Sequence, residues 1–246
     1  MKDNFSQQAQ QYAQFRPLYP EALYYYILEQ VPRRQRAWDA GTGNGQAARV
    51  LRNYFAEVVA TDISLNQLAH AKELAGISYR NEPAGHTSLE NGSVDLVTVA
   101  QAVHWFGFEK FYAEVRRVAA PGAIIAVWGY SLLRIDPYLD ALIDVYHYDT
   151  LAPYWDPERR YLDEAYRTIP FPFEEPASIP LFTIEQEWGL PELEGYFSTW
   201  SALKKFRTSK HTDPLPALMS QLAAHWPAGT RRKIVFPLHL RLGRIT

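Results

Sequence analysis

Cysteine is absent from this chain of 246 residues, which excludes disulfides, thiolate metal sites and cysteine nucleophiles. Long apolar runs are also absent, because no stretch approaches the roughly 20 apolar residues that a membrane-spanning helix needs. The opening residues MKDNFSQQAQ are polar and predict neither a signal peptide nor an Arg-rich transit peptide. We therefore expect a cytoplasmic protein with no membrane partner. The histidines form no cluster with ligand spacing, so we expect no metal site.

The residues that are present indicate a globular domain with a sizeable core. Hydrophobic residues make up 47% of the chain and charged residues 21%, a balance that excludes intrinsic disorder. The net charge of −2 argues against nucleic acid as the main partner. Residues 201–246 nevertheless hold nine Lys or Arg and one acidic residue. This basic tail either packs beside the acidic body or meets an anionic partner.

Short apolar runs alternate with helical patterns up to residue 130, as in parallel strands joined by crossover helices. Beyond it, the chain is rich in Tyr, Trp, Pro and acidic residues. In the last predicted strand, Pro237 indicates an edge position or a bulge. The predicted strands are 36–40, 58–62, 77–82, 94–100, 122–130, 182–188 and 233–242, and the predicted helices are 45–55, 64–74, 108–118, 137–148 and one that begins at Pro20.

A glycine-rich loop, residues 39–45 (DAGTGNG), follows the first predicted strand and opens a helix. Glycine lets a ligand approach the backbone closely, and a helix start supplies unpaired N–H groups. The dinucleotide fingerprint requires a glycine at position 46, where this chain has Gln. Asp39 would repel a pyrophosphate but attract an ammonium or sulfonium group, which favours S-adenosylmethionine over NAD. Asp62 ends the second strand, where an acid can accept hydrogen bonds from ribose hydroxyls.

Three segments, WDAGTGNGQ (38–46), VVATDIS (58–64) and VDLVTVAQAVHWF (94–106), resemble consecutive motifs of class I S-adenosylmethionine-dependent methyltransferases. Within that superfamily the chain is most similar to the small-molecule branch that includes trans-aconitate methyltransferases. Segments 12–20, 199–202 and 236–244 also look like features of that branch. The resemblance implies an α/β fold with a doubly wound, seven-stranded, mostly parallel sheet, its last strand antiparallel, and a helical, aromatic insert. The single domain, 1–246, would comprise a cap (1–20), a cofactor-binding core (36–130), a substrate-pocket insert (131–180) and closing strands and helices (181–246).

The resemblance also implies which residues hold S-adenosylmethionine. The loop glycines would line its methionine and ribose portion, Asp62 would bind the ribose, and Asp39 would serve the amino group, directly or through water. Ala84 and Gly85 would receive the adenine through backbone groups. Many relatives carry an acid where Gly85 stands, so a side-chain contact there is lost. The expected cofactor residues are Tyr12, Arg16, Asp39, Gly41, Thr42, Gly43, Gly45, Asp62, Ile63, Ala84, Gly85, Ala100 and Gln101.

His104, after the fourth strand, is the candidate catalytic residue, because ligands bind at this edge of such sheets. Methyl transfer depends mainly on alignment. A hydroxyl acceptor usually needs a general base to remove its proton, and the pKa of a histidine such as His104 suits that role. A carboxylate acceptor is already ionised at pH 7. His104 is then either a base, a pocket wall or a core residue bonded to the backbone.

The insert is the expected acceptor pocket. The segment from Tyr130 to Tyr161 holds six tyrosines, both ends included, and Trp155, and such amphipathic aromatics suit an apolar pocket with polar handles. The alternative is a helix packed on the domain, since residues 139, 142, 143 and 146 have helical spacing. Arg16, Arg134 or Arg159 could clamp a substrate carboxylate. The expected substrate-binding residues are Tyr19, Trp105, Tyr130, Tyr146 and Trp155.

The sequence thus predicts an enzyme, a monomer or homodimer, that methylates a small molecule, with a carboxylate or hydroxyl oxygen as the favoured acceptor. Three alternatives stay open. One is an NAD-type oxidoreductase on a similar sheet, and another is a methyltransferase-like module that holds the cofactor without turnover. The third is an enzyme acting on nucleic acid, for which the chain offers no basic–aromatic stacking motif.

Overall fold

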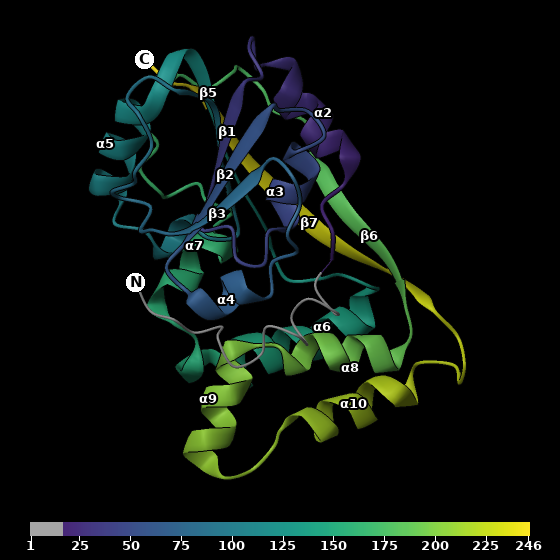
Figure 1. Ribbon diagram of the computed structural model, residues 1–246. Coiled ribbons are helices and arrows are strands. Elements are labelled where there is room, and N and C mark those ends of the chain that lie inside the picture. The colour runs from purple at the N-terminus through teal and green to yellow at the C-terminus, as the bar shows by residue number, and fades with distance from the viewer. Residues whose placement is uncertain (1–16) are drawn as a thin grey trace.

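The computed structural model describes residues 17–246, which form one seven-stranded sheet in the order β3-β2-β1-β4-β5-β7-β6 (Figure 1). The pairs among β1 to β5 are parallel, and β7 runs antiparallel to both β5 and β6. This confirms the predicted mostly parallel sheet with its last strand antiparallel. The strands are β1 (Arg36–Ala40), β2 (Glu57–Asp62), β3 (Ile77–Asn81), β4 (Val94–Ala100), β5 (Ala119–Tyr130), β6 (Phe182–Trp188) and β7 (Arg232–Arg244).

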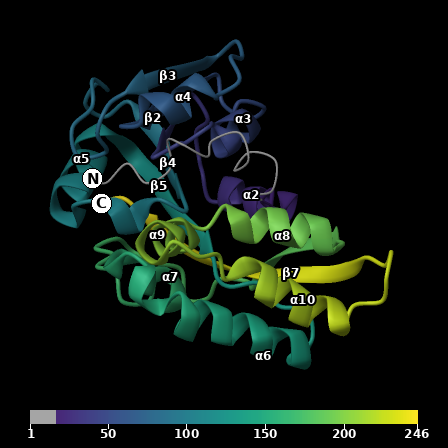
Figure 2. The same ribbon diagram turned by 90° about the horizontal axis from the view of Figure 1, so that it is seen from below.

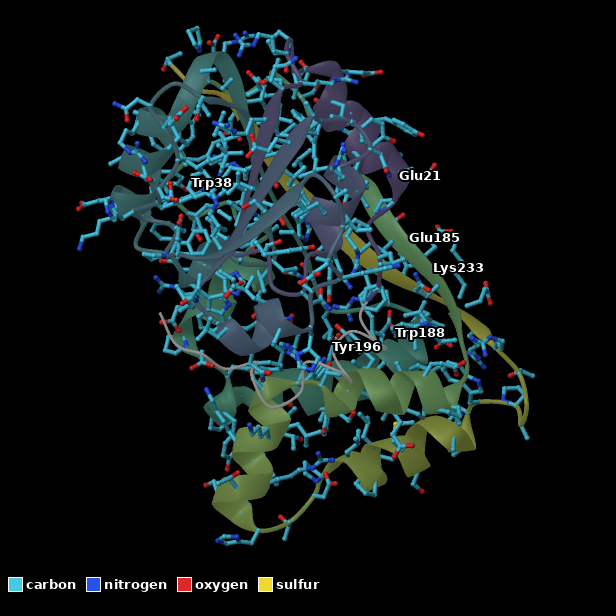
Figure 3. The ribbon with its side chains drawn as sticks, viewed as in Figure 1. Glu21, Trp38, Glu185, Trp188, Tyr196 and Lys233 are labelled. Carbon is cyan, nitrogen blue, oxygen red and sulfur yellow. The ribbon has the colours of Figure 1, made fainter. Side chains whose placement is uncertain are left out.

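Helices cover both faces of the sheet because successive side chains of a strand point to opposite faces. In β4, Leu96 joins a core that includes helices α2 and α3, whereas Val97 and Val99 join a second core against α5. Trp38, labelled in Figure 3, points from β1 into that second core. The helices are α2 (Glu21–Glu29), α3 (Gln46–Leu51), α4 (Leu65–Ala69), α5 (Phe108–Val118), α6 (Pro137–Val145), α7 (Arg160–Asp163), α8 (Leu190–Ser198), α9 (Ser201–Lys210) and α10 (Leu215–Ala224).

Helices α6, α8, α9 and α10 gather in a layer at one end of the molecule, below the sheet in Figure 1 and facing the viewer in Figure 2. This helical layer joins the predicted insert to the C-terminal part of the chain. Its apolar residues, among them Ile143, Phe197 and Leu222, are buried in the same core as α2. Trp188 and Tyr196 (Figure 3) pack their rings 5.5 Å apart where β6 passes into α8. The division of the chain into cap, core, insert and closing part stays a prediction.

Helices α3 and α4 end earlier than their sequence patterns indicated, at residues 51 and 69. Turns follow each helix, since the amides of Asn53 and Ala71 donate to carbonyls three residues earlier rather than four. Helix α6 ends at Val145, and the predicted last turn is a π-helical segment, η2 (Tyr146–Thr150). These differences shorten the helices without moving any strand.

Pro237 does not mark a sheet edge, because β7 lies between β5 and β6. Its carbonyl accepts from the Ser131 amide at 2.9 Å, but its own nitrogen has no hydrogen to return. The ladder of β5 ends at Tyr130, and pairing resumes only between Arg134 and Val235, with one extra residue on the β5 side. The proline therefore stops β5 beside an interior strand and releases the chain toward α6.

Candidate active site

A cavity lies at the carboxyl ends of β1, β2 and β4. Its wall includes residues 41–44, 46 and 47 after β1, but not Gly45, and residues 62–64 after β2. Residues 100–102 after β4, together with Trp105 and Tyr19, complete much of the remainder. In open α/β sheets this edge is where ligands bind. The structure thus brings three separate segments that the sequence singled out around one space.

Backbone conformation and close packing explain the glycines of the loop after β1. Gly41, Gly43 and Gly45 have φ angles of +67°, +57° and +81°. A Cβ on Gly41 would lie 2.7 Å from the Cβ of Ala102, and one on Gly45 would lie 2.3 Å from the hydroxyl of Tyr79. A Cβ on Gly43 would meet nothing closer than 3.8 Å. Gly43 therefore borders open space, whereas Gly41 and Gly45 are packed against side chains.

Asp62 ties this loop to the end of β2. Its Oδ2 accepts the Gly43 amide at 2.9 Å, and its Oδ1 accepts the Ser64 amide at 2.8 Å. The side chain also lines the cavity, where a carboxylate is a suitable acceptor for ribose hydroxyls. Asp62 is therefore both a loop anchor and an acceptor at the wall.

Asp39 lies behind the loop rather than in the cavity wall. It is only 1% exposed, and its carboxylate accepts the hydroxyls of Thr42 and Thr98, the latter at 2.7 Å. Burial raises its pKa to about 6, against the lowering effect of those two hydrogen bonds, and the charge of Asp62 raises it further. Thr42 does line the cavity, so its hydroxyl links Asp39 to the cavity wall.

Gln101 turns the chain at the methionine end of the expected cofactor site. Its φ of +56° is a left-handed conformation that few residues other than glycine adopt. Its Nε2 donates to the carbonyl of Tyr130 at 3.3 Å, but its buried Oε1 has no hydrogen-bond partner. Strain together with an unpaired buried acceptor is typical of functional sites, and Gln101 lines the cavity.

His104 lies in a 3-10 turn, η1 (Val103–Trp105), between two wall residues but not in the wall itself. Its ring is 5% exposed, and Nδ1 lies 3.0 Å from the hydroxyl of Tyr166. Burial lowers its pKa to about 3, and the charge of Arg159 lowers it further, so the imidazole is neutral at pH 7. Of the three roles expected for His104, that of a core residue is nearest to this arrangement. Its hydrogen-bond partner is a side chain, however, and not the backbone. Tyr166 lies 62 residues away, and no sequence signal pointed to it.

The remaining expected residues divide into three groups. Ile63 and Ala100 line the cavity with Tyr19 and Trp105, whereas Ala84 and Gly85 follow β3 outside that wall. Tyr12 and Arg16 lie outside the described residues. The adenine role of the loop after β3 therefore stays a prediction.

The aromatic residues of the insert lie away from the cavity wall. Tyr146 is buried against Phe197 and Trp200 in the helical layer, as its helical spacing allowed. Trp155 packs on Trp200 at 5.4 Å, and Tyr130 lies behind Tyr19 with ring centroids 6.5 Å apart. The packing alternative thus describes Tyr146 best, and direct acceptor contacts of these three residues stay predictions.

Comparison with known proteins agrees with this site. Residues 38–127 match the model of a methyltransferase domain. A Dictyostelium discoideum protein named as a methyltransferase is 34% identical over 224 residues, which is 89% of this chain and 85% of that protein. A solved structure from Anaeromyxobacter dehalogenans, described as a type II methyltransferase, is 40% identical, with a TM-score of 0.87 over 94% of this chain and 98% of its own. A Saccharomyces cerevisiae protein named as S-adenosylmethionine-dependent is 29% identical over 64% of this chain and 56% of its own.

The chain belongs to the class I S-adenosylmethionine-dependent methyltransferases.

S-adenosylmethionine is therefore the cofactor of this methyltransferase, and the cavity fits it. Asp62 offers carboxylate oxygens for ribose hydroxyls, and the space beside Gly43 admits a ligand close to the backbone. Asp39 lies behind Thr42, where its negative charge would attract the cationic methionine end. The NAD reading and the reading without turnover are set aside.

Residues 17–246 hold no group of three or more His, Asp or Glu side chains placed to bind a metal ion. None of the helices there is long and apolar enough to span a bilayer.

Proposed function

We propose that this methyltransferase acts on a small molecule and transfers the methyl group to an oxygen atom, with a carboxylate favoured over a hydroxyl. When bound, the cofactor would supply an electrophilic methyl on a sulfonium. The acceptor oxygen would contribute the electron pair of the new C–O bond, and the C–S pair would pass to sulfur. Alignment of these atoms is then the main contribution of the protein.

The observation that carries the preference for a carboxylate is the lack of a base in the described wall of the cavity. Among residues 17–246, the titratable side chains lining it are Asp62, which is bonded to the loop, and Tyr19. His104 is outside the wall and has a pKa of about 3. A hydroxyl or amine acceptor wants a base with a pKa near the working pH, whereas a carboxylate is ionised at pH 7 without one.

The charge change along the reaction supports the same acceptor. A carboxylate and a sulfonium neutralise each other on the way to the transition state, so a site shielded from water favours their reaction. Tyr19, Trp105 and Phe106 provide apolar wall at the cavity. The small-molecule class, the cytoplasmic location and the monomeric or homodimeric state belong to this proposal and are open to test.

The test is a screen of mono-, di- and tricarboxylic acids beside the matching alcohols and amines, each with S-adenosylmethionine. S-adenosylhomocysteine release reports turnover, and mass spectrometry with alkaline hydrolysis identifies methyl esters. We expect turnover with acids and products that alkali cleaves. Turnover confined to amines or to nucleic acid added to the same screen would overturn the proposal.

A further inference from the structure

His104 and Tyr166 form a buried pair beside the cavity. The hydroxyl of Tyr166, whose side chain is fully buried, lies 3.0 Å from Nδ1 of His104. Since Nδ1 is engaged, Nε2 is the ring nitrogen left to meet a bound molecule. His104 stands between Ala102 and Trp105, which both line the cavity. His104 therefore directly precedes a wall residue on the segment that follows β4, and Tyr166 contacts it from the turn after α7.

The backbone around Tyr166 is held in an unfavourable conformation. Ala165 and Tyr166 have φ angles of +56° and +57°, which cost energy in residues with a side chain. The Tyr166 amide donates to the carbonyl of Tyr161 at 2.7 Å, and Nη1 of Arg241 donates to the Tyr166 carbonyl at 2.9 Å. Bonds from two directions thus hold a strained turn that directs this ring to His104.

Gly129 makes the close approach of the Tyr166 ring possible. A Cβ at this position of β5 would lie 2.8 Å from Cε2 of Tyr166 and 2.6 Å from Cδ2 of Leu162. Interior strand glycines weaken a strand and mark places where another group approaches closely. Three features that are distant along the chain therefore fix the position of the Tyr166 hydroxyl. They are Gly129, the strained turn at Ala165 and Tyr166, and Arg241.

The hydrogen bond fixes which nitrogen of His104 carries the proton. The phenol is the better donor, and an unprotonated imidazole nitrogen is the better acceptor, so Tyr166 O–H donates to Nδ1. The ring stays neutral because burial lowers the pKa of His104 to about 3 and the Arg159 charge lowers it further. Gln101 Oε1, which lies next to the Tyr166 ring at Gly129, accepts no hydrogen bond, so it does not take the phenol proton instead. In this arrangement the hydrogen of the imidazole is on Nε2.

We propose that Tyr166 is a positioning residue that holds His104 as the Nε2–H tautomer, so that His104 donates a hydrogen bond to an oxygen of the methyl acceptor instead of removing a proton from it. The acceptor then arrives ionised, and no proton moves during methyl transfer. The nature of the acceptor rests on the proposed function, whereas the tautomer is a property of the protein alone.

The tautomer is measured first, without any acceptor. The protein is labelled with 15N-histidine, and long-range proton–nitrogen spectra are recorded from pH 5 to 9, free and with S-adenosylhomocysteine. The signals of His104 are those that vanish in His104→Gln. We expect protonated Nε2 and unprotonated Nδ1 throughout, and loss of that single state in Tyr166→Phe. A wild-type protein with protonated Nδ1 would overturn the proposal.

Tyr112→Phe is the matched control, because Tyr112 is a buried tyrosine of the same core that donates to the Pro170 carbonyl at 2.7 Å and does not touch His104. It should leave the His104 spectrum unchanged. Both variants should bind S-adenosylhomocysteine within about twofold of wild type, since neither tyrosine lines the cavity. If Tyr166→Phe leaves the tautomer as unchanged as Tyr112→Phe does, Tyr166 is only a packing residue.

The role of Nε2–H is tested with two substitutions at His104 and the acids of the screen above. Gln places an N–H donor near the position of Nε2. Asn places its amide near Nδ1, so it keeps a hydrogen-bond partner for Tyr166 but has no donor near Nε2. A donor role predicts that His104→Gln retains more of kcat/KM than His104→Asn, with about a tenfold loss in Tyr166→Phe. A purely structural role predicts the reverse order, and losses beyond a hundredfold in both variants would indicate a base.

The two proposals fail in different ways. If none of the acids is methylated but the spectra show the Nε2–H tautomer and its dependence on Tyr166, the choice of acceptor is wrong. If acids are methylated and Nδ1 carries the proton, the inference about Tyr166 is wrong.

Discussion

Asp39 should make the affinity for S-adenosylmethionine depend on pH. Its carboxyl group is buried and bonded to Thr42 and Thr98, and burial raises its pKa to about 6. The cationic methionine end of the cofactor favours the ionised form of Asp39, so binding lowers this pKa. Affinity should therefore rise as the pH rises through 6 and fall as the pH is lowered below it.

The expected size follows from the fraction of ionised Asp39. If the cofactor binds only the ionised form, affinity falls about tenfold from pH 7 to pH 5, or about 1.4 kcal/mol, and changes little above pH 7. Stability without ligand has the opposite sign. Because the folded pKa lies above the ordinary aspartate value of 3.8, the contribution of Asp39 to stability is greatest at low pH and declines as the pH rises from about 4 to 6.

The assay is calorimetric titration at pH 5, 6, 7 and 8 with S-adenosylmethionine and, separately, S-adenosylhomocysteine, which keeps the ammonium group but lacks the sulfonium. The comparison shows which cation Asp39 senses. Asp39→Asn is the control, because an amide can still bond both threonine hydroxyls but does not titrate, and its affinities should be independent of pH. A flat profile in the wild-type protein, or the same slope in Asp39→Asn, would refute the reasoning.

Four further substitutions test other parts of the structure. Asp62→Ala should weaken S-adenosylhomocysteine binding by about ten- to a hundredfold, since hydrogen bonds to a charged group are worth about 1.5–3 kcal/mol, and unchanged calorimetric affinity would contradict the ribose role. Gly41→Ala should abolish cofactor binding because its Cβ would lie 2.7 Å from a neighbouring side chain, whereas Gly43→Ala should cost only about 1–2 kcal/mol of backbone strain in urea unfolding. Equal effects of Gly41→Ala and Gly43→Ala on cofactor binding and on the free energy of unfolding would count against the packing argument. Burial alone would raise the pKa of Glu114, but hydrogen bonds, those from Arg117 first, lower it to about 2. Glu114→Gln should therefore cost about 2 kcal/mol in urea unfolding at pH 7, and the difference should narrow as the pH falls below about 4.5, whereas a constant difference would exclude this charge effect.

The sheet was predictable because its strands are buried on both faces, which leaves continuous apolar runs such as 94–100 in the sequence. The glycine loop and Asp62 were predictable for a similar reason, because backbone conformation and the order of strand, loop and acid are local. The ends of α3 and α4, at residues 51 and 69, were harder to predict, because nothing in the local composition separates a last helical turn from the turns that follow.

The surroundings of the site were harder to predict because they depend on contacts between distant segments. Tyr166 meets His104 only after β5 and α7 are packed, and its sequence neighbours are unremarkable. Tyr146 carries the pattern of both a pocket residue and a packed helix residue, and burial against α8 decides between them. The position of Pro237 in an interior strand likewise depends on where the neighbouring strand stops.

The hydrogen bonds of the glycine loop also bear on how quickly a ligand is captured. The amides of Gly41 and Thr42 donate to the Thr61 carbonyl at 2.8 and 3.0 Å, and that of Gly43 donates to Asp62, so groups of the protein itself hold the loop. A loop held in this way should lose little conformational entropy when the cofactor arrives. Capture should follow single-step kinetics limited by encounter, and differences between donor and product should be found in their residence times.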